Sequence, residues 1–377
     1  MKKNNNELKE VAWVFFKLGC FAFGGPAAHI AMMEEEVVNK RKWMSRQHYL
    51  DLIGATNLIP GPNSTEMTMH CGHERAGFKG LFIAGLAFIF PAVVITGFLG
   101  WLYVEYGELP QVEPFVTGIK PAVLAIIASA ILKLGKKALK NWELAALGIV
   151  VLTVRLLGVN EVLALLGAGI NGALYFYGKH NVQDTSKSII PLAFLQISGG
   201  VMAKLTTVSV FLTFLKVGAV LYGSGYVLFA YLDAELVESG WMTRQELLDA
   251  IAVGQFTPGP VLSTATFIGY QLTGFWGALA ATAGIFLPSF LFVLVLNPLV
   301  PRMRKSKLLS AFLDSVNVAA VAVMVAVLFA MSWETLVDWR TMTIAVISAT
   351  ITFGFKKVSV MWTILGGSLL GYLLTMI

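Results

Sequence analysis

The chain has 377 residues, of which 56% are hydrophobic and 13% are charged, and its mean hydropathy is +0.73. A soluble globular protein carries about 25% charged residues. This composition therefore excludes a soluble globular protein and predicts an all-α polytopic membrane protein. The net charge of +6 gathers in short loops, a pattern that orients membrane proteins and does not indicate nucleic-acid binding. Cys20 and Cys71 lie in or beside apolar segments, so no disulfide framework is expected.

In chain order, the sequence contains two sets of apolar runs, and a membrane crossing needs about 20 such residues. The N-terminus lacks the pattern of a cleaved signal peptide, so the first run is expected to remain in the mature protein. About ten transmembrane helices are expected from these runs. They cover 9–33, 79–103, 116–133, 142–157 and 161–177, and then 208–231, 275–299, 308–332, 341–354 and 357–376.

One motif occurs twice among these runs. Residues 43–62 read WMSRQHYLDLIGATNLIPGP and residues 241–260 read WMTRQELLDAIAVGQFTPGP, with ten of twenty positions identical. The similarity extends on both sides, from Lys17 and Lys216 to Pro91 and Pro288, while the offset drifts only from 199 to 197. We therefore expect two homologous halves, 1–178 and 208–377, joined by a central connection at 179–207.

The basic loops at 133–140 and 301–307 belong in the cytoplasm by the positive-inside rule. Two loops on the same side of the membrane must be separated by an even number of crossings. This holds for these two loops only if the second Pro-Gly-Pro segment, 246–272, is a re-entrant hairpin rather than a full crossing. By symmetry 49–73 is then also a re-entrant hairpin, and each half crosses five times. The halves then have opposite orientation, which is an inverted repeat. This scheme places the lysine-bearing N-terminus outside, against the same charge rule.

The Pro-Gly-Pro turns at 60–62 and 258–260 are expected to break helices, because proline removes an N–H group and glycine permits unusual backbone angles. The second proline suits the first turn of a new helix. That helix would direct unpaired N–H groups and its positive dipole end into the membrane, which favours an anion. A pair of purely structural kinks is the alternative interpretation.

Several further residues are candidates at this site. Lys17 and Lys216 are isolated charges in apolar surroundings, which indicates either function or snorkelling to the interface. Glycine-rich turns near 24 and 224 indicate either close ligand approach or helix packing. The candidate binding residues are Lys17, Gly24, Gly25, Pro26, Asn57, Pro60, Gly61, Pro62, Asn63, Ser64, Lys216, Gly223, Gly225, Gln255, Pro258, Gly259, Pro260, Ser263 and Thr264.

Two other sets of residues are not expected to bind substrate. Arg46 with Asp51, and Arg244 with Asp249, recur five residues apart and are expected to pair and hold each loop to its hairpin. Glu66, His70 and His73 are suitable metal ligand types. The second repeat has no equivalent of them, so no metal site is expected. The sequence carries no nucleotide-binding, hydrolase or redox-cofactor motif, and neither an enzyme nor a cofactor is expected.

In combination, these motifs resemble the chromate ion transporter family. The resemblance rests on 23–26 (FGGP), Trp43 and 60–62 in the first half, and on Lys216, Trp241, 257–260 (TPGP) and 265–270 (ATFIGY) in the second. It covers most of the chain and is typical of a long member with both halves in one polypeptide. Ser224 stands where the family's second half usually has glycine.

The resemblance implies a secondary transporter that exports chromate across the inner membrane and confers chromate resistance. Sulfate has the same shape and charge, so it is a second candidate substrate. An anion channel and, less favoured, a divalent-metal transporter remain as alternatives. The expected partners are an inorganic oxyanion and the lipid bilayer, without nucleic acid, and a homodimer is left open.

Overall fold

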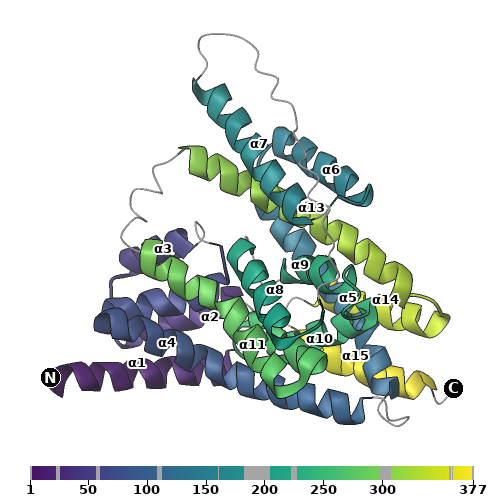
Figure 1. The fold of residues 1–377 in the computed structure, drawn as a ribbon, viewed down its shortest axis with the longest axis horizontal. Helices are drawn as coiled ribbons and strands as arrows, with labels where there is room; N and C mark the ends of the chain where they lie inside the picture. Colours follow the sequence, from purple (N-terminus) through teal and green to yellow (C-terminus); the bar gives the residue numbers. More distant parts are fainter. Residues whose placement is uncertain are drawn as a thin grey trace.

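The computed structural model describes residues 2–22, 26–56, 60–107, 113–159, 161–181, 204–221, 227–296, 307–355, 358 and 360–375. Within these residues every regular element is helical, which confirms the predicted all-α class (Figure 1). The two halves have the same order of elements.

The described residues of the first half form eight helical elements. They are α1 (Lys2–Phe21), α2 (Pro26–Glu34), the π-helix η1 (Glu35–Lys40), α3 (Arg46–Thr56), α4 (Asn63–Tyr106), α5 (Glu113–Ala138), α6 (Trp142–Leu156) and α7 (Glu161–Asn181).

The second half repeats this order. Its elements are α8 (Thr207–Val220), α9 (Leu228–Leu232), the π-helix η2 (Asp233–Val237), α10 (Arg244–Phe256), the short 3-10 helix η3 (Val261–Ser263), α11 (Thr264–Leu296), α13 (Lys307–Thr335), α14 (Trp339–Gly354) and α15 (Val360–Thr375).

The first predicted run of each half is not one continuous helix. The run 9–33 divides between α1, which ends at Phe21, and α2, which begins at Pro26. The run 208–231 likewise divides between α8, which ends at Val220, and α9. Proline has no N–H to continue a helical ladder, which accounts for the new start at Pro26. Each π-helix then follows the second piece in the corresponding place.

Among the described residues, four helical stretches are long and apolar enough to cross a membrane, namely Asn63–Tyr106, Glu113–Ala138, Val261–Val295 and Ser310–Thr335. Shorter apolar helices cover Leu163–Phe176, Thr207–Val220 and Val360–Thr375. Large aromatic and aliphatic side chains are exposed along these helices, including Phe90 at 59% and Trp276 at 69%. Such a surface suits lipid rather than water, and the protein is a multi-pass membrane protein.

Helix α4 contains a sharp reversal at Gly77, where φ is 64° and ψ is −152°. Helix α11 contains the same reversal at Gly274, where φ is 68° and ψ is −153°. After each reversal the chain runs back along itself, since a Cβ on Gly72 would meet the Gly80 carbonyl and Ala84. In α11 the hydroxyls of Thr266 and Thr282 lie 2.7 Å apart across the same turn. Each Pro-Gly-Pro turn is therefore followed by a short helix and then by a long antiparallel one.

The two halves are interlocked rather than placed side by side. Helices α1, α4, α8 and α11 form what we call the inner bundle, in which α1 packs on α4, α8 on α11, and α4 on α11. The remaining long helices form the outer bundle. In it α5 packs against α15 and α14 of the other half, and α13 packs against α7 and α6 (Figure 1). Each bundle thus contains elements from both repeats.

Polar caps mark the helix starts outside the apolar spans. Thr243 and Glu246 form a reciprocal capping box at the start of α10. Asp338 accepts a hydrogen bond from the Thr341 backbone N–H at 2.7 Å at the start of α14. That hydrogen bond holds the pKa of the Asp338 carboxyl below its usual value.

The antiparallel packing after each reversal leaves no room for a side chain at Gly269. A Cβ there would overlap the Gly277 carbonyl and crowd Ala281. We expect Gly269→Ala to lower the free energy of unfolding by about 1–3 kcal/mol, the usual range for overpacking. Gly366→Ala is the control, because a Cβ at Gly366 meets open space. Thermal unfolding in detergent measures both, and equal stabilities would contradict the close packing.

Candidate functional site

The two Pro-Gly-Pro turns are each hydrogen-bonded to the opposite repeat. The Gly61 N–H donates to the Leu221 carbonyl at 2.6 Å, and the Gly259 N–H donates to the Ala22 carbonyl at 3.0 Å. Ala22 and Leu221 are equivalent positions, directly after α1 and α8. Each turn is thus joined to the broken first helix of the other half. The pair of contacts places both turns at the boundary between the repeats.

Both central glycines need their conformational freedom. Gly61 has φ of 135° and Gly259 has φ of 87°, which L side chains rarely adopt. Each also packs closely against the long helix of the opposite half, because a Cβ on Gly259 would crowd Ala92 and one on Gly61 would crowd Ser289. Ala92 and Ser289 are equivalent positions, so the two environments differ by one hydroxyl.

The helix that follows each turn begins with buried hydroxyl groups. Ser64 is 2% exposed, and Ser263 and Thr264 are fully buried. The Thr264 hydroxyl donates to the Val261 carbonyl at 2.7 Å. The Ser263 hydroxyl has no hydrogen-bond partner among the described residues. A buried hydroxyl without a partner is unfavourable, so the Ser263 hydroxyl is suited to binding a ligand.

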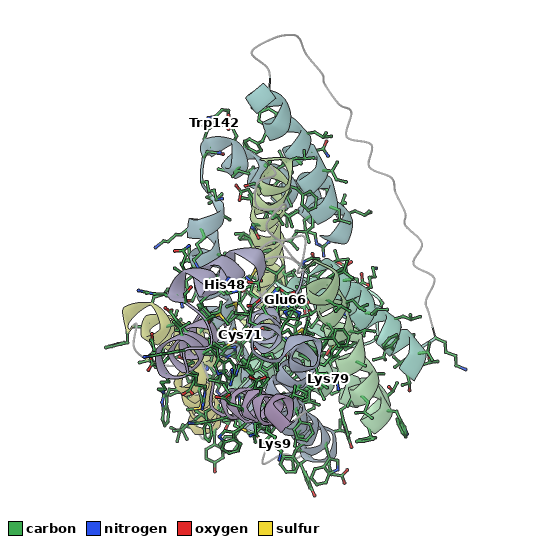
Figure 2. All side chains as sticks on the ribbon, turned by 90° about the vertical axis from the view of Figure 1, so that its left-hand side faces the viewer. Lys9, His48, Glu66, Cys71, Lys79 and Trp142 are labelled. Carbon is green, nitrogen blue, oxygen red and sulfur yellow. The ribbon has the colours of Figure 1, made fainter. Side chains whose placement is uncertain are left out.

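Glu66 occupies the matching space in the first repeat. It lies one turn into α4, is fully buried, and its Oε1 would overlap any Cβ at Gly61. Figure 2 shows Glu66 and Cys71 among the packed helices, with His48 close by in the same view. When the two repeats are aligned so that Gly72 matches Gly269, Glu66 matches Ser263. The two turns therefore carry different side-chain chemistry at equivalent positions.

The carbonyl of Ala22 has a second neighbour in His29. The His29 Nε2 lies 3.0 Å from this oxygen, and the imidazole is 2% exposed with its edge toward Phe88. The end of α1 is therefore held by both α2 and the opposite Pro-Gly-Pro turn. The equivalent of His29 in the second half is Leu228, so this second hold belongs to the first repeat.

Several residues predicted for the site fall outside the described residues. They are Gly24, Gly25, Asn57, Gly223 and Gly225.

The other predicted positions are placed near the turns. Pro26 begins α2, Asn63 begins α4, and Gln255 lies near the end of α10, where its Nε2 is buried without a described partner. Pro60, Pro62, Pro258 and Pro260 are all buried.

The two lysines are exposed, unlike the buried Pro-Gly-Pro turns. The side chain of Lys216 is 52% exposed, and its Nζ lies 2.6 Å from Glu235 Oε1 in η2. Lys17 is also exposed, and its charge acts on Glu36 in η1, the equivalent of Glu235. Each lysine therefore has a carboxylate from the neighbouring π-helix close to it.

The arginines hold their loops through partners other than those expected. Arg244 binds Asp233, with Nε 2.7 Å from Oδ1, and it also contacts Glu334. Arg46 binds Glu34 at 2.9 Å, which is the equivalent pair in the first repeat. The pairing of Arg244 with Asp249 is thus not the one in the structure, because an acidic residue in the preceding π-helix or helix is nearer. The side chain of Asp51 lies outside the described residues.

Asp249 instead belongs to a cluster that the sequence did not reveal. Its Oδ2 accepts a hydrogen bond from the Tyr103 hydroxyl at 2.7 Å and lies 3.5 Å from Lys120 Nζ. Tyr103 and Lys120 come from α4 and α5, so the cluster joins α10 to the opposite half. A similar cross-repeat contact pairs Arg155 with Glu238. Only the isolated charge of Lys120 in an apolar run hinted at this cluster.

The described part of the chain contains no group of three or more His, Cys, Asp and Glu residues placed to hold a metal ion. His70 is buried one turn beyond Glu66 on α4, and His73 is a further turn along. Sequence reasoning considered Glu66 only as a metal ligand. Its position in the first turn after a duplicated Pro-Gly-Pro, as a lone acidic residue in an apolar helix, was the signal for a different role.

These features define the class of protein. It is a helical membrane protein built from two homologous repeats, whose broken helices meet at the repeat boundary, an arrangement typical of transporters.

The chain belongs to the chromate transporter family, whose model (Chromate transporter) matches residues 9–173 and again 208–372. It is 32% identical to a probable chromate transport protein of Synechococcus elongatus, over 90% of this chain and 88% of that one. It is 30% identical to the chromate transport protein of Cupriavidus metallidurans, over 97% and 92% of the two chains, and 29% identical to that of Pseudomonas aeruginosa, over 95% and 90%. No solved structure matches the chain.

The two arginine pairs provide a matched test of burial. Asp233 is 1% exposed, so Arg244→Gln would leave a buried carboxylate without its main partner. We expect a loss of unfolding free energy approaching the about 3–5 kcal/mol seen for buried pairs. Arg46 is 75% exposed, and Arg46→Gln should cost only about 0–1 kcal/mol. Chemical unfolding in detergent compares them, and similar losses would show that burial of Asp233 does not matter.

Proposed function

We propose that this protein is a secondary transporter that exports chromate across the cytoplasmic (inner) membrane and thereby confers chromate resistance. The observation that carries the proposal is the reciprocal attachment of each Pro-Gly-Pro turn to the opposite repeat, with new helices starting inside the protein. The named relatives are chromate transport proteins, which supports chromate as substrate.

The chemistry of the turns favours a small oxyanion. The first N–H groups of a helix have no partner within it, and the helix dipole makes this end positive. Hydroxyl groups of Ser64, Ser263 and Thr264 lie in these first turns, and those of Ser64 and Ser263 can donate further hydrogen bonds, whereas the Thr264 hydroxyl already donates to the Val261 carbonyl. A tetrahedral dianion offers four oxygens as acceptors. Recognition by N–H and hydroxyl donors would also accept sulfate, the second candidate substrate.

In the membrane, the proposed topology has ten crossings and two re-entrant hairpins in an inverted repeat. The units are 1–178 and 208–377, with 179–207 between them. The reversals at Gly77 and Gly274 support this topology, because each separates a short helix after the turn from a long membrane-length helix. The short helix 63–76 can return toward the side from which α3 enters.

Transport requires the site to open, because both turns are buried. The interlocking of α5 with α15 and of α13 with α7 argues against simple rocking of one half against the other. We propose instead that the inner bundle moves against the outer bundle. The Asp249 cluster links α10 and α4 to α5 and is one contact that such a movement would have to change.

The lysines are proposed to set the potential near the site rather than to clamp the anion. Lys216 is bound to Glu235, which offsets its charge. The membrane potential can supply the driving force, since moving one charge through 100 mV is worth about 2.3 kcal/mol. A dianion leaving a cell with a negative interior is favoured by about twice that amount.

Chromate uptake into proteoliposomes at imposed potentials tests the function. We expect saturable uptake into the compartment made positive, with inhibition by sulfate, because a tetrahedral dianion site cannot strongly separate the two ions. Protein-free liposomes give the background. Uptake without saturation would indicate an anion channel, and no uptake by folded protein would overturn chromate as the substrate.

Ser263→Ala tests the site itself. The Ser263 hydroxyl has no described partner, so its removal should leave stability unchanged or slightly higher. If it binds the anion, the KM for chromate should rise about tenfold or more, the value of one hydrogen bond to a charged group. Thr335→Val is the matched control, because Thr335 Oγ1 is also buried without a described partner but lies at the end of α13. An unchanged KM in Ser263→Ala would remove this residue from the site.

A further inference from the structure

The carboxyl group of Glu66 is the least satisfied polar group near the two turns. The residue is fully buried, and neither carboxyl oxygen has a hydrogen-bond partner among the described residues. It lies against Gly61, where Ser289 of α11 approaches from the opposite repeat with its own hydroxyl unpartnered. The side chain therefore projects into the first Pro-Gly-Pro turn rather than away from it.

An ionised carboxylate is expensive to bury without a partner. The N-terminal end of α4 offsets only part of this penalty, because the dipole effect is small compared with the loss of hydration. Among the described residues, no hydrogen-bond donor reaches either oxygen of the Glu66 carboxyl. In this closed arrangement the group is therefore best accommodated as a neutral carboxylic acid, which can donate a hydrogen bond as well as accept one.

The titratable groups near Glu66 are few. His70 and Cys71 follow it on α4, and His29 on α2 is held at Ala22. From α11 the facing group is the hydroxyl of Ser289, which does not titrate. On α10 the buried acid is Asp249, which is already engaged by Tyr103 and Lys120.

The position of Glu66 also conflicts with an anion when the group is charged. The helix end that would attract an oxyanion in the first repeat is the one that Glu66 occupies. Two negative charges at one poorly hydrated site disfavour each other strongly. At the second Pro-Gly-Pro turn, Ser263 takes the place of Glu66, and Ala92 of the opposite repeat takes the place of Ser289, so this turn carries no such charge. The repeats have thus diverged at the positions where a ligand would bind.

We propose that Glu66 is a proton-binding site coupled to the anion site, so that an oxyanion binds only when this carboxyl carries a proton. This inference rests on the proposed function. Each transport cycle would take one proton from water onto the Glu66 carboxylate, move it with the anion in the same direction, and release it to water on the other side. The dianion and the proton together carry one net negative charge, so the membrane potential would favour coupled export by about half as much as export of the dianion alone. Coupling of this kind is reciprocal, and the anion must therefore also favour protonation.

The test uses purified full-length protein in proteoliposomes with a pH-sensitive dye inside. Chromate is added at mildly alkaline pH, where it is a dianion, and the membrane potential is clamped. We expect wild-type protein to acidify the lumen as chromate enters. The rate of chromate exchange should fall up to tenfold for each pH unit once Glu66 is mostly ionised.

Glu66→Gln replaces the carboxyl with a permanently neutral group of the same shape. We expect its chromate exchange to be independent of pH and its proton movement to fall to the protein-free background. Glu74→Gln is the matched control, since Glu74 lies on the same helix, is 35% exposed and contacts His48. It should keep the wild-type pH profile and proton movement.

The outcomes separate this inference from the proposed function. Chromate uptake by wild-type protein without proton movement would overturn the role of Glu66 and leave the oxyanion transporter standing. Proton movement by Glu66→Gln at the wild-type rate would also overturn the role of Glu66. If Glu66→Gln fails to fold, Glu66→Asp replaces it, because aspartate keeps a titratable carboxyl group and the variant should still move protons. In that case, absence of proton movement in the wild-type protein would overturn the inference. No chromate uptake at any pH would contradict the proposed function as well.

Discussion

The reciprocal hydrogen bonds from Gly61 to Leu221 and from Gly259 to Ala22 are the constraint on which the centre of this protein depends. A backbone N–H and a backbone carbonyl freed by broken helices would be costly inside a membrane. Here each repeat breaks two helices, one after its first helix and one at its Pro-Gly-Pro turn. The N–H group of each Pro-Gly-Pro turn donates to the carbonyl group at the end of the first helix of the other repeat. The breaks are therefore stable only together, and they fix the position of both turns.

This mutual dependence explains why the surroundings are so closely packed. Gly61 and Gly259 must adopt positive φ to direct their N–H groups across the boundary, and neither has space for a Cβ. The helices behind them are equally constrained, because a Cβ on Gly19 would overlap the Phe88 carbonyl, and one on Gly218 would overlap the Ile285 carbonyl. Both halves thus share these close backbone contacts, while side chains such as Glu66 and Ser263 differ between them.

Much of this architecture could be predicted from the sequence because it depends on local residue patterns. Apolar runs gave the long helices α5, α6, α7, α13, α14 and α15 nearly to their ends, and the Pro-Gly-Pro turns marked real helix breaks. Contacts between distant residues could not be predicted in the same way. Asp249 meets Tyr103, which is 146 residues away, and nothing in either local sequence specifies that partner. Arg244 was expected to pair within its own helix and instead reaches back to Asp233, because side-chain direction depends on the turn between them.

The interlocking of α5 and α13 with the opposite half has a consequence for biosynthesis. When the first half has left the ribosome, α5 lacks α14 and α15, and the glycine face that includes Gly118 has no Gly367 or Gly371 to receive it. The early helices can enter the bilayer, but their packing is complete only after α13, α14 and α15 have been synthesised. A nascent chain truncated after α7 would leave that face open to lipid or to a second copy of the same half. In a chain with both halves covalently joined, the partner instead arrives at a fixed place and a fixed ratio.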